Sequence, residues 1–194
     1  EIIVENQLPV KKVILASSQF VYGDGEYRCP HRSKSFFPEL RSLKQFTSKN
    51  WDIVCPHGRR AKFLPFKENQ PLMPTNAYGL SKEALERLSL RLGKTYDIPT
   101  TILRYSITQG PRQSPFNLYS GALRIFVSQA LSGVPITVYE DGRQTRDFVN
   151  VKDVVSANLL VLTKPTTDFE ILNVGGGRAY PVLAFAKLVK KITA

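Results

Sequence analysis

The stretch Asn76-Ala77-Tyr78-Gly79-Leu80-Ser81-Lys82 opens a segment whose apolar spacing predicts a helix over residues 76–92. Tyr78 and Lys82 are one helical turn apart and therefore lie on the same face. A tyrosine phenol has a pKa of ~10, and a nearby ammonium favours the phenolate, which makes the phenol usable in proton transfer. Such a pair also occurs by chance on solvated helices, so its meaning depends on the surrounding sequence.

The leucine spacing in this segment predicts which helix face is buried. The residues expected inside are Leu80, Ala84, Leu85, Leu88 and Leu92, and those expected outside are Glu83, Glu86, Arg87 and Arg91. Asn76, preceded by two prolines in residues 68–76, marks the start of the helix, and Asp97-Ile98-Pro99 marks its end.

Short runs of branched apolar residues predict buried strands over residues 10–16 and 100–105. A strand, a long connection with a helix, and a second strand form the pattern of a parallel α/β sheet. Further strands are expected at 136–139 and 170–174. Helices are expected at 123–131, at 153–162 and after Pro181. The sequence therefore predicts an α/β fold with a parallel sheet and flanking helices.

Polar residues follow several of these strands. Ser17 and Ser18 come at the carboxyl end of the first one, where open α/β sheets bind ligands. Arg143 and Arg146 suit forked contacts with phosphate oxygens. Taken singly, the two serines are better explained by a polar turn after a strand and the two arginines by a solvated surface. The glycines at 175–177 do not match Gly-x-Gly-x-x-Gly and are interpreted as a tight turn.

Length and composition indicate one globular domain or a large part of one, with 194 residues of which 42% are hydrophobic. No run approaches the ~18–20 apolar residues of a membrane span, and the acidic residues 1–5 do not resemble a signal peptide. Two cysteines cannot build a disulfide framework, so a cytoplasmic setting is expected. The absence of an initiating Met indicates an excised piece.

The formal net charge of +11 predicts a basic surface that attracts anions. Phosphorylated small molecules satisfy that charge as well as nucleic acid does. The basic residues are spread along the chain, without a helix-turn-helix or RNA-binding signature. Nucleic acid is therefore not the expected partner, and neither is a membrane.

Residues 24–67 have an irregular composition that predicts an inserted loop or subdomain. They contain both cysteines and both histidines of the chain, as two copies of Cys-Pro-His. Two thiolates and two imidazoles are a tetrahedral zinc set, so Cys29, His31, Cys55 and His57 are candidate ligands. The spacing differs from Cys-x-x-Cys, and a coincidental repeat with free thiols is the alternative.

Over residues 10–187 the chain resembles an extended short-chain dehydrogenase/reductase of the nucleotide-sugar epimerase/dehydratase branch. Five motifs occur in that family's order, and their agreement strengthens the interpretation of Tyr78 and Lys82. They are Ser17-Ser18-x-x-Val21-Tyr22-Gly23; Pro74-x-x-x-Tyr78-x-x-x-Lys82; Leu103-Arg104-Tyr105 with Gly110-Pro111-Arg112; Asp141-Gly142-x-x-x-Arg146-Asp147-Phe148-Val149-x-Val151-x-Asp153-Val154; and Asn173-Val174-Gly175.

The resemblance implies a Rossmann-like sheet and a catalytic set of Tyr78, Lys82 and Ser18. Tyr78 would exchange a proton with a sugar hydroxyl while hydride passes to NAD, or to NADP. Lys82 would bind the nicotinamide ribose, and Ser18 would hydrogen-bond the reacting oxygen. The implied cofactor-binding residues are Ser17, Tyr78, Lys82 and Tyr105.

The resemblance also implies substrate-binding residues for a nucleotide sugar. Arg146 would grip the diphosphate, Thr137 and Tyr139 would lie near the base, and Arg112 would belong to the same group. These residues come from a region of substrate-binding loops at 106–150. Members of the family often dimerise through the helix that bears the tyrosine, so a homodimer is expected.

Three departures from the family pattern refine the expected function. Gln19-Phe20 stands where sugar 4,6-dehydratases carry Asp-Glu, which disfavours water elimination, and Ile107 stands where relatives have an Asn. The third departure is that the sequence contains no glycine-rich dinucleotide fingerprint. Residues 1–194 therefore look like the central part of an NAD(P)-binding epimerase domain that lacks its N-terminal glycine-rich unit.

The leading hypothesis is an NAD-dependent 4-epimerase that acts on a UDP- or dTDP-hexose. Transient oxidation at C4 and hydride return to the other face would give no net redox change. The alternatives are a dehydratase or reductase of the same family, and a non-catalytic module that binds an anionic partner.

Overall fold

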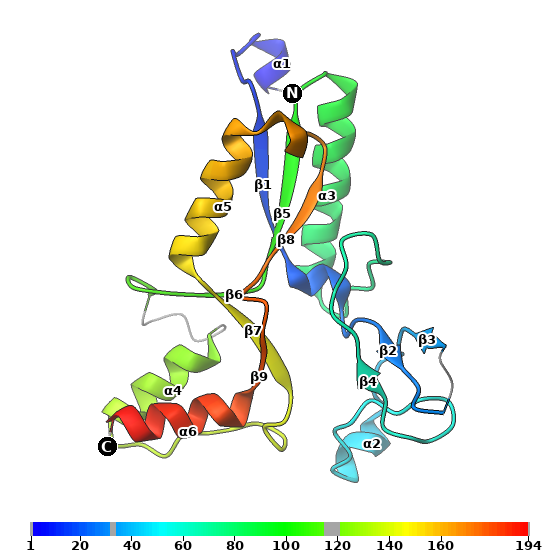
Figure 1. The fold of residues 1–194 in the computed structure, drawn as a ribbon, viewed down its shortest axis with the longest axis vertical. Coiled ribbons are helices and arrows are strands. Elements are labelled where there is room, and N and C mark those ends of the chain that lie inside the picture. Colours follow the sequence, from blue (N-terminus) through cyan, green and yellow to red (C-terminus); the bar gives the residue numbers. More distant parts are fainter. Residues whose placement is uncertain (1, 32–33, 115–120, 194) are drawn as a thin grey trace. The chain divides into compact units, whose positions relative to one another are not determined.

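The computed structural model describes residues 2–31, 34–114 and 121–193. The chain divides into two compact units, and Figure 1 shows their elements in chain order. The first unit comprises Glu1–Tyr105 with Val155–Val174, and the second comprises Ser106–Val154 with Gly175–Ala194.

The first unit is built on a parallel sheet with the strand order β1-β5-β8. Its strands are β1 (Val13–Ser18), β5 (Thr100–Tyr105) and β8 (Ile171–Val174). Ser18 is opposite Tyr105, and Tyr105 is opposite Val174, so the polar ends of the strands align at the carboxyl edge. Ile102 and Leu103 of the central strand are buried in the core. The predicted α/β fold with a parallel sheet is confirmed.

Two long helices flank this sheet (Figure 1), namely α3 (Ala77–Thr95) and α5 (Val151–Thr163). Helix α3 begins where the side chain of Asn76 accepts a hydrogen bond from the Gly79 amide at 2.8 Å, as its sequence predicts. It ends before Asp97, which adopts a left-handed φ of 53°. The first unit also contains the short helices α1 (Ile2–Glu5), η1 (Gln19–Tyr22) and η2 (Pro165–Thr167).

The prediction of the buried face of α3 is wrong. The buried residues of the helix are Gly79, Glu86 and Gly93, and Glu86 is only 2% exposed. The expected inward residues Leu80, Ala84, Leu85, Leu88 and Leu92 are exposed. The sheet selects a face whose small residues allow close approach and whose polar groups find partners on the strands. An outward leucine stripe remains, consisting of Leu80, Leu85, Leu88 and Leu92.

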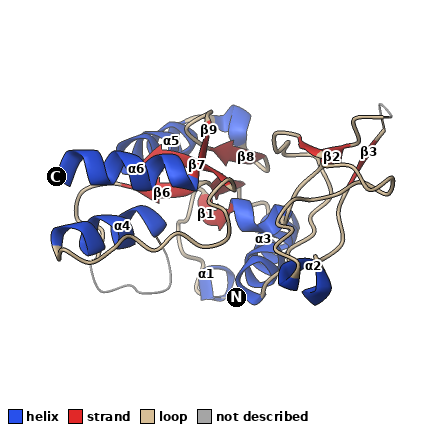
Figure 2. Cartoon of the chain, turned by 90° about the horizontal axis from the view of Figure 1, so that it is seen from below, coloured by secondary structure: helices blue, strands red, loops and turns tan. Residues whose placement is uncertain are grey.

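The segment over residues 24–67 has little regular structure, and Figure 2 shows that loops make up most of it. Its strands β2 (Tyr27–Arg28), β3 (Ser35–Phe36) and β4 (Lys62–Phe63) form an antiparallel sheet in the order β3-β2-β4. The short helix α2 (Leu43–Thr47) lies between β3 and β4 in the chain. The ring of Phe66, just after β4, stacks on Tyr22 at 4.6 Å and meets Phe63 edge-on. The stack of Phe66 on Tyr22 is therefore one contact that holds this segment to the rest of the first unit.

The second unit has a mixed sheet with the order β6-β7-β9. Its strands are β6 (Ile107–Gln109), β7 (Thr145–Asn150) and β9 (Ala179–Pro181). Helices α4 (Ala122–Leu131) and α6 (Val182–Thr193) share a core built around Phe126, Val182, Ala186 and Val189. The region predicted as substrate loops, 106–150, thus contains two strands and a helix, and its residues 115–120 lie outside the described part.

The strand predicted at residues 136–139 is absent, although all four residues are described. The backbone amide of Thr137 donates to the side chain of Gln129 at 3.1 Å, a contact that replaces a strand ladder. The glycines at 175–177, predicted as a tight turn, lie in the connection between β8 and β9, which bends at Gly177, where φ is 75°. A Cβ on Gly176 would lie 2.1 Å from the Phe148 carbonyl oxygen, so the close approach of β7 requires glycine there.

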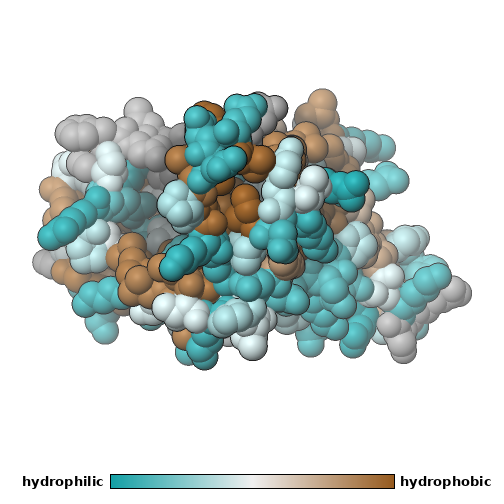
Figure 3. All heavy atoms as spheres, turned by 90° about the horizontal axis from the view of Figure 1, so that it is seen from above, coloured by the Kyte–Doolittle hydropathy of each residue, from teal (hydrophilic) through white to brown (hydrophobic). Residues whose placement is uncertain are grey.

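In the described part of the chain, no helix combines the length and the apolar character that a membrane crossing requires. Hydrophobic side chains do reach the surface, and Figure 3 shows them gathered in patches between hydrophilic residues on the face seen from above.

Candidate active site

The three residues of the predicted catalytic set come from the start of α3 and the carboxyl end of β1. Lys82 Nζ donates a hydrogen bond to the Ala16 carbonyl oxygen at 2.8 Å and lies 5.8 Å from the centroid of the Tyr78 ring. Tyr78 and Lys82 therefore do share a helix face, and that face is turned towards β1. Ser18 is the last residue of the same strand and is 6% exposed.

The short helix η1 joins these two elements. Ser18 caps it, because its Oγ accepts a hydrogen bond from the Phe20 amide at 3.3 Å. The Phe20 ring meets the Tyr78 ring edge-on at 5.9 Å, while Tyr78 remains 44% exposed. A Cβ on Gly79 would lie 2.5 Å from the Phe20 carbonyl oxygen, so glycine beside the tyrosine allows α3 to approach η1 this closely.

A buried ion pair lies behind this catalytic face. Arg104 Nη2 donates to Glu86 Oε2 at 2.7 Å and Arg104 Nε donates to Glu86 Oε1 at 3.0 Å, and both side chains are 2% exposed. Ser17 Oγ donates a further hydrogen bond to Glu86. The hydroxyl of Ser17, predicted to bind cofactor, is therefore engaged by α3, and the assignment of Ser17 to the cofactor stays a prediction.

Tyr22 extends this network. Its hydroxyl accepts from Arg104 Nη1 at 2.8 Å and donates to Asn173 Oδ1 at 2.7 Å. Burial raises the pKa of Tyr22, although Arg104 opposes the shift, so the phenol stays neutral and can donate. Burial acts against the charge of Arg104, but its hydrogen bonds to Glu86 and Tyr22 outweigh burial and raise the pKa of Arg104.

Sequence reasoning missed this network because it assigned Glu86 to the solvent face. A signal was present, since Tyr78, Lys82 and Glu86 follow one another at intervals of four residues and therefore share one helix face. Once Tyr78 and Lys82 face the strands, Glu86 must face them as well.

Tyr105, predicted to line the cofactor, ends β5 beside Ser18. Its hydroxyl is hydrogen-bonded to the side-chain amide of Asn158 on α5, at 2.8 to 3.0 Å. This contact fixes the ring at the carboxyl edge of the sheet, where the predicted role would require it.

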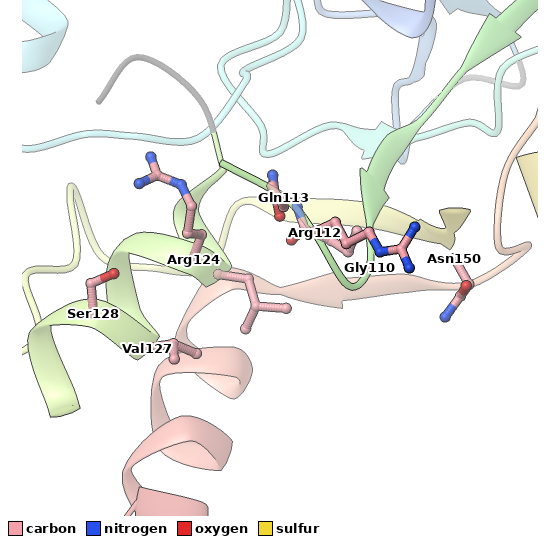
Figure 4. A pocket seen from close by; sticks show the side chains of 9 residues that line it. Gly110, Arg112, Gln113, Arg124, Val127, Ser128 and Asn150 are labelled. Carbon is pink, nitrogen blue, oxygen red and sulfur yellow. The ribbon is translucent and has the colours of Figure 1, made fainter. Parts of the chain in front are cut away.

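The second unit contains an open pocket of about 530 Å³ (Figure 4). Arg124 projects from α4 and Arg112 from the loop after β6, and both residues line the cavity, although their guanidinium groups point to opposite sides in Figure 4. The lining residues are Gln109, Gly110, Arg112, Gln113, Leu123, Arg124, Val127, Ser128 and Asn150. Such a basic and partly apolar pocket suits an anion that carries a ring.

Among the four predicted substrate residues, only Arg112 lines this pocket. Tyr139 is 78% exposed, and Arg146 is an exposed residue of β7 whose Nη1 donates to the Thr145 carbonyl oxygen. Thr137 is tied to Gln129. Sequence reasoning missed Gln109, Arg124 and Asn150, which the pairing of β6 with β7 and the position of α4 bring to the pocket.

The predicted zinc ligands do not come together as a set. Cys29 Sγ donates to Cys55 Sγ at 2.9 Å, and both thiols are buried. This hydrogen bond is the main cause that lowers the pKa of Cys55. His31 and His57 are exposed in turns, and the described residues contain no group of three or more His, Cys, Asp or Glu placed to hold a metal. The zinc site is therefore not formed, because each turn directs its histidine to solvent.

Comparisons with known sequences point to one family. The profile of the NAD dependent epimerase/dehydratase family matches residues 54–175. The dTDP-L-rhamnose 4-epimerase of Burkholderia thailandensis is 30% identical over 188 residues, which are 96% of this chain and 50% of that protein. A putative UDP-glucose 4-epimerase of Methanocaldococcus jannaschii is 38% identical over 128 residues, covering 66% of this chain and 41% of that protein.

Solved structures of the same family are also similar. The UDP-glucose 4-epimerase of Thermotoga maritima, solved with UDP-glucose, has a TM-score of 0.72 at 29% identity and aligns with 96% of this chain and 48% of its own. The UDP-glucuronic acid 4-epimerase of Bacillus cereus, solved with NAD, has a TM-score of 0.68 at 26% identity, with coverages of 96% and 48%. The chain spans about half the length of the relatives it matches. With the matching profile, the five ordered motifs and the parallel sheet in agreement, this chain belongs to the NAD-dependent epimerase/dehydratase family and has its Rossmann-like fold.

Proposed function

We propose that this chain carries the catalytic centre of an NAD-dependent nucleotide-sugar 4-epimerase that acts on a UDP- or dTDP-hexose. The observation that supports this most directly is the geometry of Tyr78, Lys82 and Ser18. A phenol, an ammonium beside it and a strand-end hydroxyl form the set that proton exchange with a sugar hydroxyl requires.

The residues fit the nicotinamide end of NAD. An ammonium has three donors, and Lys82 Nζ directs one to Ala16, which leaves others suited to ribose hydroxyls. Tyr105 at the end of β5 would line the same edge. The sequence contains no Gly-x-Gly-x-x-Gly fingerprint that would cradle the pyrophosphate, so the fit concerns the nicotinamide half alone. When bound, NAD supplies a hydride acceptor that can return the hydride.

The proton chemistry falls to the residues of α3 and β1. Tyr78 would act as the phenolate and take the proton of the sugar 4-hydroxyl as C4 is oxidised. The ammonium of Lys82 would stabilise that phenolate before the proton is transferred. Ser18 donates a hydrogen bond to the oxygen as it gains carbonyl character. Tyr78 would return the proton to the oxygen as C4 is reduced again on its opposite face, so the configuration would invert without net redox change.

Epimerisation is favoured over dehydration by the residues at the end of β1. Elimination of water needs an acid and a base near the sugar, and Gln19-Phe20 supplies neither. The Phe20 ring instead packs against Tyr78.

The test is to incubate the protein in its full length with UDP-glucose and with dTDP-hexoses and to follow the sugars by NMR. We expect the C4 epimer to appear while no reduced nicotinamide accumulates. A 4-keto-6-deoxy product would instead assign the protein to the dehydratases, and no turnover of any nucleotide sugar would overturn the proposal.

The pocket in the second unit is proposed as the site of the nucleotide diphosphate. Arg112→Gln and Arg124→Gln should each raise the KM for the nucleotide sugar by about tenfold, because each removes a charge-assisted hydrogen bond of about 1.5–3 kcal/mol. The kcat should change little. Arg91→Gln, which removes an exposed charge from α3, is the control. An unchanged KM in both pocket variants would remove the diphosphate from this pocket.

We also propose that the leucine stripe of α3 is covered by a second copy of the chain in a homodimer. The four exposed leucines on one helix support this, since water-exposed apolar stripes of this kind mark interfaces. We expect the full-length protein to sediment with twice the mass of one chain. The variant Leu88→Glu should sediment with the mass of the monomer. A monomeric wild-type protein would contradict the proposal.

A further inference from the structure

The catalytic face of α3 is attached to β1 at two successive residues. Lys82 Nζ donates to the carbonyl oxygen of Ala16, and the next turn of the helix brings Glu86 to the hydroxyl of Ser17. Ser18, the residue that follows, is the predicted partner of the reacting oxygen. The register between helix and strand at this point therefore sets how Tyr78 and Ser18 face each other.

Arg104 connects this register to the rest of the sheet. It lies opposite Ser17 on β1 and opposite Asn173 on β8. Its guanidinium bonds Glu86 on one side and the Tyr22 hydroxyl on the other, and Tyr22 in turn bonds Asn173. With the Ser17 hydroxyl on β1, one network of five side chains thus ties α3 to the carboxyl ends of all three strands.

A buried ion pair is not needed for stability alone. Well-packed apolar residues of similar volume serve as well or better in other proteins, because they carry no desolvation penalty. The forked pair instead fixes the relative orientation of the two side chains, because both oxygens of Glu86 accept hydrogen bonds from nitrogens of the planar Arg104 guanidinium. A helix held in this way cannot slide or rotate without breaking charged hydrogen bonds.

We propose that Glu86 and Arg104 are positioning residues, whose buried ion pair fixes the height and rotation of α3 so that the Tyr78 phenol meets the substrate oxygen beside Ser18. This inference rests on the proposed function. Neither residue touches the substrate; both act through the helix that carries Tyr78 and Lys82. Tyr78 itself is 44% exposed, so its place is determined largely by the helix beneath it.

The experiment is the kinetic analysis of Glu86→Gln in the full-length enzyme, with kcat, KM and the pH profile of kcat measured beside the melting temperature. Displacement of a reacting group by about 1 Å can cost about a hundredfold in rate. We therefore expect kcat to fall by about ten- to a hundredfold while KM stays within about twofold. The pH profile should shift, because α3 carries Tyr78 and Lys82 together away from Ser18 and from the Ala16 carbonyl oxygen that Lys82 contacts, which changes the surroundings of the phenol.

Two control variants separate positioning from a loss of charge or of stability. Glu83→Gln makes the same change of charge on the same helix, where Glu83 pairs with Arg87, a residue whose side chain is 75% exposed. Lys12→Gln breaks the Lys12–Asp168 pair at the other end of the sheet, and the side chain of Lys12 is 8% exposed. Glu83→Gln should leave all parameters unchanged, and Lys12→Gln should lower the melting temperature but not kcat.

Tyr22→Phe provides the second test, for use also where Glu86→Gln does not fold. It removes a single hydroxyl from Arg104 and Asn173 and should lower kcat several-fold with the same shift of the pH profile. A folded Glu86→Gln or Tyr22→Phe enzyme with unchanged kcat and pH profile would overturn the proposal, as would a loss of kcat in Lys12→Gln of equal size.

A failure of the proposed function is recognised separately, because the wild-type enzyme would then not epimerise nucleotide sugars. Amide hydrogen exchange tests the positioning role in that case. Glu86→Gln should speed exchange in the first turns of α3 around Tyr78, whereas Lys12→Gln should not. Equal exchange in the two variants would reject the role of Glu86 whatever the reaction.

Discussion

Replacing Tyr78 by Phe should lower kcat by about 10²- to 10⁴-fold, the contribution typical of a positioned acid/base group. The change removes one oxygen and keeps the ring that meets Phe20 at 5.9 Å. The phenol is the only group of the proposed set that can take the proton of the sugar hydroxyl, so water alone would have to replace it. Because the ring stays in place, the free energy of unfolding should change by less than about 0.5 kcal/mol.

The matched control is Tyr96→Phe, at the other end of the same helix. Tyr96 is 45% exposed against 44% for Tyr78, so both substitutions remove a similarly exposed hydroxyl. Tyr96→Phe should retain full kcat, measured as appearance of the C4 epimer by NMR. Substantial activity in Tyr78→Phe would disprove the acid/base assignment, since no neighbouring carboxylic acid stands at Gln19-Phe20 to take over.

Replacing Arg104 by Met should lower the free energy of unfolding by about 3–5 kcal/mol, the cost of leaving one partner of a buried ion pair alone. Glu86 would keep the hydrogen bond from Ser17 but lose three contacts to the guanidinium in an environment where it is 2% exposed. Equilibrium unfolding in urea, read out at constant protein concentration, measures the loss.

Arg87→Met is the control for this prediction, since Arg87 forms an ion pair with Glu83 on the same helix while its side chain is 75% exposed. The side chain of Glu83 is 15% exposed, but the pair is open to solvent at Arg87, and such pairs contribute about 0–1 kcal/mol, so this variant should lose far less stability than Arg104→Met. The double variant Arg104→Met/Glu86→Leu should recover much of the stability, because no charge is then left unpaired. Equal stability of Arg104→Met and Arg87→Met would show that the buried pair contributes no more to the free energy of unfolding than the pair on the helix surface.

Local pattern was sufficient for several elements. Strand β5 occupies the predicted residues 100–105, and the Asn76 cap and the start of α3 occur where the sequence places them. Each depends on chemistry within a few residues, namely a run of branched apolar side chains, a side-chain acceptor for an amide, and a proline that ends a helix. The contact between Tyr78 and Lys82 follows from helical periodicity in the same way.

The predictions from sequence were wrong where the outcome depends on which distant part of the chain a segment packs against. The leucines of α3 form the more apolar face of the helix, yet the sheet contacts the face with Gly79, Lys82 and Glu86. Residues 136–139 have the composition of a strand but meet Gln129 instead of a neighbouring strand. The Cys-Pro-His repeats brought two thiols together, while both histidines point to solvent.

The sequence by itself determined the α/β class, the family and the pairing of Tyr78 with Lys82, because helical and strand periodicity and short ordered motifs are local properties. Only the tertiary structure decided that Glu86 lies inside against Arg104, Ser17 and the sheet, and that Arg112 shares a pocket with Arg124. A buried charge needs a partner, and the partner of Glu86 is Arg104, 18 residues away on another element. No local pattern specifies which distant strand will supply that partner.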